Sequence, residues 1–370
     1  MGSVNQRTYQ SEVYLLLKKL SESYGLQSEE SLISSLFNSL SGECLNYTVT
    51  KKFPSVSSIC GDMTPFQFSV SLSKNPKSAR ALRYVTEICR TNMMLPERVS
   101  LARKSIPVLL ELIGAAGFQT KINEVIDKLL PQSRLMPQYP TFGIWFGVHH
   151  EAAMPPRLKI YCNLLWELGD PWLMFEEILQ LLDIDSGEAV NNIRTSFGSQ
   201  CRPCFVRIEC TSSGIGGARL YLRGYELSRR SINDYLDKMG WDDFKREYGI
   251  FHEIVMGHRE TWIPRSSILS MDLQGTGSAP NGIKLEAGPR YYTKDDEEIY
   301  MKIMEIAHEL ELDTGPYEQL LGLLSSVKPA SGTMRFHDVI GIGSKQGIGT
   351  RLNIYLRPDI RRYFDSMKKV

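Results

Sequence analysis

Basic and phenolic side chains alternate along the segment 156–162, where Arg157, Lys159 and Tyr161 are separated by apolar residues. In a β-strand, alternate side chains share one face. One face of this strand would therefore carry two cations and a phenol, and the other face would be apolar. A row of cations is unusual in a protein interior and is typical of a surface that binds an anion. The pattern recurs in two further segments, with Arg219, Tyr221 and Arg223 in one and with Arg351, Asn353, Tyr355 and Arg357 in the other.

Two other segments carry weaker copies of the same pattern. Lys284 and Glu286 alternate with apolar residues in segment 282–286, and Gln67 and Ser69 do so in segment 64–70. Each copy alone is an ordinary amphipathic strand with a solvated polar face. Five copies with the same sense of alternation favour a single polar surface that several strands share.

The composition limits the kind of protein that this chain can be. Its 370 residues allow two domains or one large domain spanning residues 1–370, and 42% of them are hydrophobic, which is enough for a large core. A formal net charge of +1 argues against a general nucleic-acid binder, which would carry a basic excess. No apolar run reaches the length of a membrane span, and residues 1–6 lack the apolar core of a signal peptide. We therefore expect a cytoplasmic protein with no nucleic-acid or membrane partner.

The cysteines favour reduced thiols over disulfides or a metal site. Their number, seven, is odd, which fits a cytosolic protein better than a disulfide framework. Cys201 and Cys204 have the spacing of metal ligands, but the sequence offers no second pair that would complete a zinc site. A strand is also expected directly after them. We expect no metal site.

Two further motifs resemble ligand-binding sequences but have ordinary explanations. Residues 341–349 are as rich in glycine as a phosphate-binding loop, yet a strand follows instead of a helix, so we expect a hairpin turn. Asp295 and Asp296 could form half of an acidic site for a metal diphosphate. They also open an expected helix, where acidic side chains are favourable, and this second explanation is preferred.

The hydrophobic periodicity predicts helices that alternate with β-hairpins along the chain. The expected helical segments are 8–40, 79–130 with breaks near 95 and at 114–117, 171–192, 231–248, a helix capped by Thr293 that reaches Leu310, and a short helix after Pro358. The expected hairpins pair 45–52 with 65–72, 141–149 with 157–164, 205–210 with 219–223, 268–273 with 282–287, and 334–340 with 351–356.

Five helix-separated hairpins between about 45 and 357 predict an α+β fold with a ten-stranded antiparallel β-barrel. The apolar face of each strand would pack against an outer ring of α-helices. The polar face would line a solvent-filled lumen. Closure of the sheet would also remove its two edges.

The order of these motifs resembles that of the DMATS-type aromatic prenyltransferases, whose ABBA fold is a ten-stranded antiparallel barrel ringed by helices. The resemblance extends over nearly the whole chain. Residues 283–296 are similar to the family's K-x-Y and R-x-Y-x-x-(N/D)-D segment, and the strand around Lys159 and the closing strand 351–358 also match. Residues 62–69, followed by Arg83, are similar to the family's first motif.

The resemblance implies an enzyme that transfers a dimethylallyl or geranyl group from its diphosphate to an aromatic acceptor. The foremost acceptor would be a tryptophan-derived indole in alkaloid biosynthesis, a branch of secondary metabolism. Members of the family are generally metal-independent, so no cofactor is expected, and the chain would act as a monomer or homodimer. The diphosphate would bind to Arg83, Lys159, Arg219, Lys284 and Arg351, and the allyl cation would be shielded by Tyr161, Tyr221 and Tyr355.

Three positions depart from the family's pattern. Gln67 stands where a glutamate usually accepts the indole N–H, although glutamine can still accept this hydrogen bond. Glu286 replaces a tyrosine of the cation shield, and Gly217 replaces a common cation.

His149 aligns with a lysine that often removes the proton from the alkylated ring in the family. An imidazole is a suitable base at pH 7. The alternative is that His149 only ends a strand at a solvated turn.

Two other functions are open at this point. One is prenylation of a tyrosine, another phenol or a cyclic peptide by a related barrel. The other is a ligand-binding barrel without turnover, which the loss of the glutamate at position 67 allows.

Overall fold

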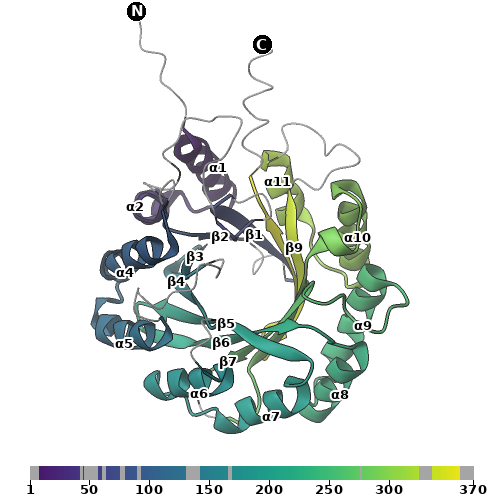
Figure 1. Ribbon diagram of the computed structural model, residues 1–370. Coiled ribbons are helices and arrows are strands. Elements are labelled where there is room, and N and C mark those ends of the chain that lie inside the picture. The colour runs from purple at the N-terminus through teal and green to yellow at the C-terminus, as the bar shows by residue number, and fades with distance from the viewer. Residues whose placement is uncertain are drawn as a thin grey trace, which may run out of the picture.

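Ten strands form one closed antiparallel barrel in the computed structural model of the protein (Figure 1). The structure describes residues 8–41, 45, 57–60, 64–75, 80–89, 93–130, 142–165, 169–275, 277–324 and 336–358. The strands are β1 (Phe66–Leu72), β2 (Ala81–Thr86), β3 (Ile144–Glu151), β4 (Met154–Asn163), β5 (Cys201–Thr211), β6 (Gly214–Gly224), β7 (Ser267–Leu273), β8 (Gly282–Ala287), β9 (His337–Lys345) and β10 (Gly349–Leu356). The predicted barrel is therefore confirmed.

Helices surround the barrel as a ring, which Figure 1 shows from one end of the barrel. They are α1 (Tyr9–Ser23), α2 (Glu30–Ser41), α4 (Leu95–Leu112), α5 (Gln119–Leu129), α6 (Pro171–Leu181), α7 (Gly187–Phe197), α8 (Arg229–Met239), α9 (Asp242–Met256), α10 (Asp296–Glu309) and α11 (Gly315–Leu324). The helices α11, α6 and α9 pack on β1, β5 and β9, respectively.

The main core lies between the outer face of the barrel and the helices. In β4, Leu158, Ile160 and Cys162 are fully buried on this outer face. Their neighbours Lys159 and Tyr161 face the lumen, because alternate side chains of a strand point to opposite faces. The alternation seen in the sequence thus separates a dry apolar layer from a polar interior surface.

The prediction that segment 65–72 forms a hairpin with segment 45–52 is wrong. The ladder of β1 joins it to β2 on one side and to β10 on the other, so both of its edges are occupied. Of the expected partner segment 45–52, the residues after Leu45 lie outside the described residues. The segment 79–130 was expected to be helical, but it begins with the strand β2. Its first described helix, α4, starts at Leu95.

Two helix predictions need smaller corrections. The segment 171–192 forms two helices, α6 and α7, and Asp183 adopts a left-handed backbone conformation (φ 56°) just after α6 ends. The cap of α10 is Asp295 and not Thr293. The side chain of Asp295 accepts a hydrogen bond from the backbone N–H of Glu298.

The hairpin turn expected in 341–349 is confirmed, although β9 and β10 extend into it and leave only residues 346–348 as the turn. The short helix expected after Pro358 lies outside the described residues.

Candidate active site

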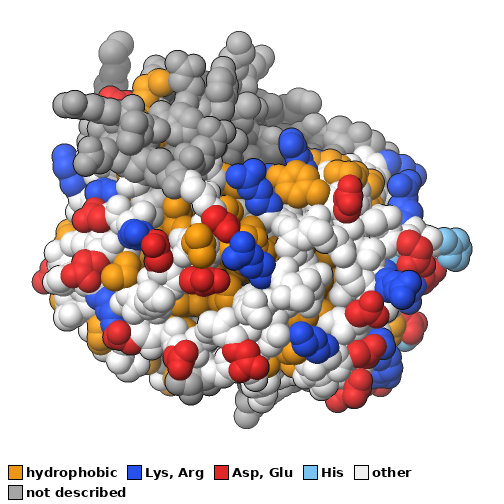
Figure 2. All heavy atoms as spheres, turned by 60° about the horizontal axis from the view of Figure 1, so that its bottom comes forward, with side chains coloured by type: hydrophobic (Ala, Val, Ile, Leu, Met, Phe, Trp, Pro, Cys, Tyr) orange, Lys and Arg blue, Asp and Glu red, His pale blue; other side chains and the backbone are white. Residues whose placement is uncertain are grey.

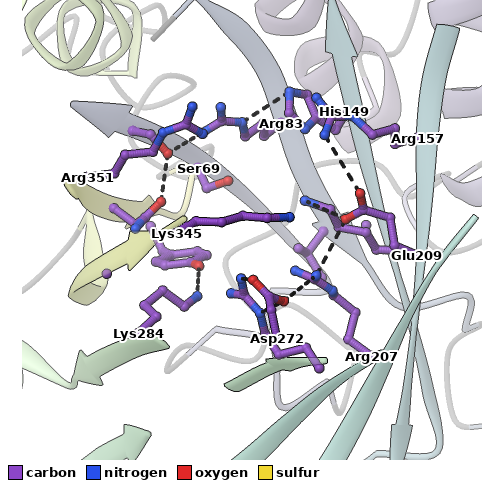
Figure 3. A pocket seen from close by; sticks show the side chains of 18 of the residues that line it. Ser69, Arg83, His149, Arg157, Arg207, Glu209, Asp272, Lys284, Lys345 and Arg351 are labelled. Carbon is purple, nitrogen blue, oxygen red and sulfur yellow. Dashed lines mark hydrogen bonds and ion pairs between the residues drawn. The ribbon is translucent and has the colours of Figure 1, made fainter. Parts of the chain in front are cut away.

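A cavity inside the barrel collects nearly all of the side chains that the sequence singled out (Figure 3). Its empty space, including the part open to solvent, is about 1010 Å³. Of the predicted site residues, those that line it are Arg83, His149, Lys159, Tyr161, Arg219, Tyr221, Lys284, Arg351 and Tyr355. Gln67 is not part of this lining.

Within the part of the chain that the structure describes, three cations of the cavity have no carboxylate partner. Among the described residues, Arg83, Lys345 and Arg351 make no ion pair, and Figure 3 shows Lys345 extended into the open space between the strands. Burial and the charges of Arg351 and Arg157 together lower the pKa of Arg83 to about 10. Because like charges repel one another in this enclosed space, the arrangement favours the entry of an anion.

Other cations of the cavity are held by two carboxylates. Arg219 and Arg207 both donate hydrogen bonds to Asp272, and Lys159 lies 4.0 Å from Glu209. Burial alone would raise the pKa of Glu209, but Lys159, Arg207 and Arg157 lower it to about 2. The carboxylates are therefore ionised, and they fix the directions of the arginines before any ligand arrives.

Lys284 lies between the cationic part of the lumen and its tyrosines. Its ammonium group donates to Glu286 Oε1 at 2.5 Å and to the hydroxyl oxygen of Tyr355 at 2.8 Å. The ammonium also lies 5.8 Å from the ring centre of Tyr221. Burial lowers the pKa of Lys284 to about 8, against the opposing effect of Glu286. Gly343, on the neighbouring strand, gives this lysine room, since a Cβ there would lie 2.8 Å from Lys284 Cβ.

Aromatic rings cover the adjoining wall of the lumen. Tyr221 stacks on Phe205 with ring centres 4.1 Å apart, and Tyr161 lies 6.1 Å from Tyr221. Phe142 and Trp145 continue this cluster, which is separate from the main core. Burial raises the pKa of Tyr161, Tyr221 and Tyr355, so the phenols are neutral at pH 7. Neutral electron-rich rings can stabilise a cation through their faces.

Comparison with known proteins gives matches in structure. No family model matches the chain, and no curated protein matches it in sequence. PriB, solved in complex with the product diphosphate, is 16% identical with a TM-score of 0.79, and the match covers 96% of this chain and 97% of PriB. The chain has the prenyltransferase barrel fold.

Two further solved structures agree with this assignment of the fold. The 6-dimethylallyltryptophan synthase from Micromonospora olivasterospora, in complex with DMASPP and Trp, is 16% identical with a TM-score of 0.80, covering 95% of this chain and 98% of the synthase. The 5-dimethylallyltryptophan synthase from Streptomyces coelicolor is 17% identical with a TM-score of 0.78, covering 96% of this chain and 99% of the synthase.

In this prenyltransferase barrel, His149 lies in the cationic part of the lumen. Its Nε2 accepts a hydrogen bond from Arg83 Nε at 3.5 Å, and it pairs with Arg157 across the β3–β4 ladder. Burial lowers its pKa well below the usual value, and Arg83, Lys159 and Arg157 lower it further. The ring is therefore neutral at pH 7, but these neighbours oppose its protonation.

Gln67 is buried in β1 of the barrel and is held by a second polar residue. Its amide nitrogen donates to Asp338 Oδ2 at 3.3 Å, and Arg357 donates to Asp338 Oδ1 at 3.2 Å. The amide nitrogen of Gln67 donates and is engaged by Asp338. The amide oxygen is the group of this side chain that can accept a hydrogen bond from the N–H or O–H of an aromatic substrate.

The site residues predicted from the sequence do not include several residues that line the cavity, namely Arg157, Arg207, Glu209, Asp272 and Lys345. Strand parity had placed Arg157 on the correct face, and the same parity applied to segment 205–210 finds Arg207 and Glu209. Lys345 lies in the glycine-rich segment 341–349, which was expected to form only a turn and therefore gave no lumen residues. Asp272 has no cationic neighbour in its own strand, so its role depends on the partner strand.

The described residues contain neither a cluster of metal ligands nor a membrane-spanning helix. Within the described residues, no group of three or more His, Cys, Asp or Glu side chains could hold a metal ion. None of the described helices has both the length and the apolar character of a membrane span. Of the seven cysteines, those at 60, 89, 162, 201, 204 and 210 are buried, and Cys162, Cys201, Cys204 and Cys210 are free thiols.

Proposed function

We propose that the protein is an aromatic prenyltransferase that moves a dimethylallyl or geranyl group from its diphosphate to an aromatic acceptor, foremost a tryptophan-derived indole. The observation that carries this proposal is the set of cations Arg83, Lys345 and Arg351. They form no ion pair with any described residue, and they share one lumen with Tyr161, Tyr221 and Tyr355. An allylic diphosphate has an anionic head and an apolar tail that becomes cationic. This lumen offers a complementary surface to each part.

In the proposed reaction, the bond between the allylic carbon and the diphosphate oxygen breaks first. Arg83, Lys159 and Lys284 stabilise the departing diphosphate through charge-assisted hydrogen bonds. The tyrosine rings stabilise the allyl cation and exclude water, which would otherwise capture it. The acceptor ring then attacks the cation, a carbon–carbon bond forms, and loss of a ring proton restores aromaticity.

The solved relatives support the choice of substrates within this proposal. PriB was solved with diphosphate, and the Micromonospora olivasterospora synthase was solved with DMASPP and Trp. Both proteins are only 16% identical to this chain, so the acceptor of this chain depends on its own residues. Gln67 and Glu286, which depart from the family's pattern, are the residues that we expect to tune this choice.

The surroundings of the enzyme form a further part of the proposal. We place it in the cytoplasm, in secondary metabolism and alkaloid biosynthesis, as a monomer or homodimer that needs no metal. On the face seen in Figure 2, basic and acidic side chains are interspersed, in keeping with the net charge of +1. This distribution supports small molecules as its partners, since nucleic acids are bound by concentrated positive charge.

Incubation with dimethylallyl diphosphate and a panel of indoles and phenols tests the proposed function. Mass spectrometry of the products should show one added dimethylallyl group, with the highest yield on an indole. Turnover should persist in EDTA. Binding of the diphosphate without any alkylated product would favour a ligand-binding barrel. Activity that disappears in EDTA and returns only with magnesium would contradict the metal-free mechanism.

A further inference from the structure

Glu286 places a carboxylate inside the barrel at a position where the related family usually has a tyrosine. It lies two residues beyond Lys284 on β8, on the same face, and is 7% exposed. Gly341, its partner across the β8–β9 ladder, leaves room for it, since a Cβ at Gly341 would lie 2.8 Å from Glu286 Cγ. The ammonium of Lys284, 2.5 Å from Glu286 Oε1, offsets the cost of burying the carboxylate.

The same carboxylate is joined to the tyrosines of the proposed cation shield through Lys284, whose ammonium also donates to Tyr355 and lies 5.8 Å from the ring centre of Tyr221. After burial, which is the main cause, the charge of Glu286 contributes to the raised pKa of Tyr161, Tyr221 and Tyr355. Across the β7–β8 ladder, Glu286 pairs with Ile268, which packs on the cluster of Phe205 and Tyr221. The carboxylate therefore lies at the wall where the allyl cation and the acceptor ring would meet.

The other candidate for a base lies in a different environment. His149 accepts a hydrogen bond from Arg83 and pairs with Arg157. Although Glu151 Oε2 lies 3.5 Å from its Nε2, burial and the neighbouring cations lower the pKa of His149, so protonation is disfavoured there. Glu286 has the opposite charge, which attracts both the allyl cation and the positively charged ring that forms from it.

We propose that Glu286 is the general base that takes the proton from the alkylated ring, an inference that rests on the proposed function. When the carbon–carbon bond has formed, the ring carries a positive charge and an additional hydrogen at the alkylated carbon. A carboxylate oxygen of Glu286 binds this proton as the carbon–hydrogen bond breaks, and the bonding electrons return to the ring. Glu286 is then neutral, diphosphate carries the negative charge away, and the carboxyl group returns its proton to water after product release.

Substitution with glutamine tests this role, because it removes the base and keeps the shape. In the parent enzyme, loss of the ring proton should follow the slower ionisation, so an acceptor with deuterium on its ring should react at the same rate as the ordinary acceptor. In Glu286→Gln, turnover should fall by about 100-fold or more. Deprotonation should then limit the rate, and a primary isotope effect should appear.

Asp338→Asn is a matched control, since the side chains of Asp338 and Glu286 are both 9% exposed and each forms an ion pair. Asp338→Asn and His149→Gln should show no isotope effect. Glu286→Asp, which keeps a shorter carboxylate, should regain part of the lost rate. Pyrophosphate binding, measured by calorimetry, should persist in Glu286→Gln and so verify that the barrel is folded.

Three outcomes would overturn the assignment. Glu286→Gln could keep the parent's rate, it could be slow without an isotope effect, or the isotope effect could appear in His149→Gln instead. Each of these requires an active parent and leaves the proposed function intact. A parent that alkylates no aromatic acceptor would overturn the proposed function and the base together.

Discussion

Arg219 and Asp272 face each other across the β6–β7 ladder, and the guanidinium donates through Nε to Asp272 Oδ1 at 2.5 Å and through Nη2 to Oδ2. Arg207 donates to the same Oδ1 at 3.0 Å. One buried carboxylate therefore orients two arginines toward the lumen. Such preorganisation reduces the entropy that an incoming diphosphate would otherwise lose in ordering them.

Asp272→Asn should destabilise the fold, because two enclosed guanidinium groups lose the carboxylate that neutralises them. We expect the free energy of unfolding to fall by about 3 kcal/mol. Urea denaturation measures this change. Pyrophosphate should then raise the midpoint of unfolding more in Asp272→Asn than in the parent, since the ligand replaces the missing negative charge. Equal midpoints in the two proteins without ligand would show that Asp272 has no such role.

Lys345→Ala and Lys159→Ala should each weaken the binding of inorganic pyrophosphate. Both lysines line the cavity, and a charge-assisted hydrogen bond to the anion contributes about 1–3 kcal/mol. Isothermal titration calorimetry gives the two dissociation constants. Lys104, an exposed lysine of α4, is the matched control, and Lys104→Ala should bind pyrophosphate like the parent. An unchanged affinity in both cavity variants would place the anion elsewhere.

The affinity for pyrophosphate should decrease as the pH rises through about 8. The pKa of Lys284 is lowered from its ordinary value to about 8, so the ammonium is charged below this pH and loses its charge above it. The dissociation constant should therefore be lower below pH 8 and increase above it. Lys284→Arg should move this alkaline limb to higher pH, because guanidinium remains charged there. A limb at the same pH in Lys284→Arg would assign it to another group.

Gln67→Ala should lower turnover or scatter the position of alkylation, because the acceptor's N–H or O–H would lose its partner in a buried site. Rates and product structures from the indole panel check this. Gln67→Glu should show a different defect, since its carboxylate would lie against Asp338, 3.3 Å from the present amide nitrogen. Repulsion should make this variant more active at low pH, where one carboxyl group is protonated. If Gln67→Ala matched the parent in rate and product, the residue would have no orienting role.

Much of the lumen could be predicted from the sequence because strand alternation is a local property. Lys159, Tyr161 and Arg219 are separated from their strand neighbours by apolar residues, and the side-chain period of two fixes which residues share a face. The helical spacing between hairpins likewise predicted the outer ring. These features need no knowledge of which strands are neighbours, and the structure has them where the sequence indicated.

Only the tertiary structure decided which residues meet across strands. The pairing of β1 with β10 joins segments nearly 300 residues apart, and a local pattern contains no information about such a register. For the same reason, the sequence did not reveal that Asp272 would bind Arg219, that His149 would lie among cations, or that Glu286 would be joined to the tyrosines through Lys284. Charge partners, and the pKa shifts that they produce, depend on distances set by closure of the barrel.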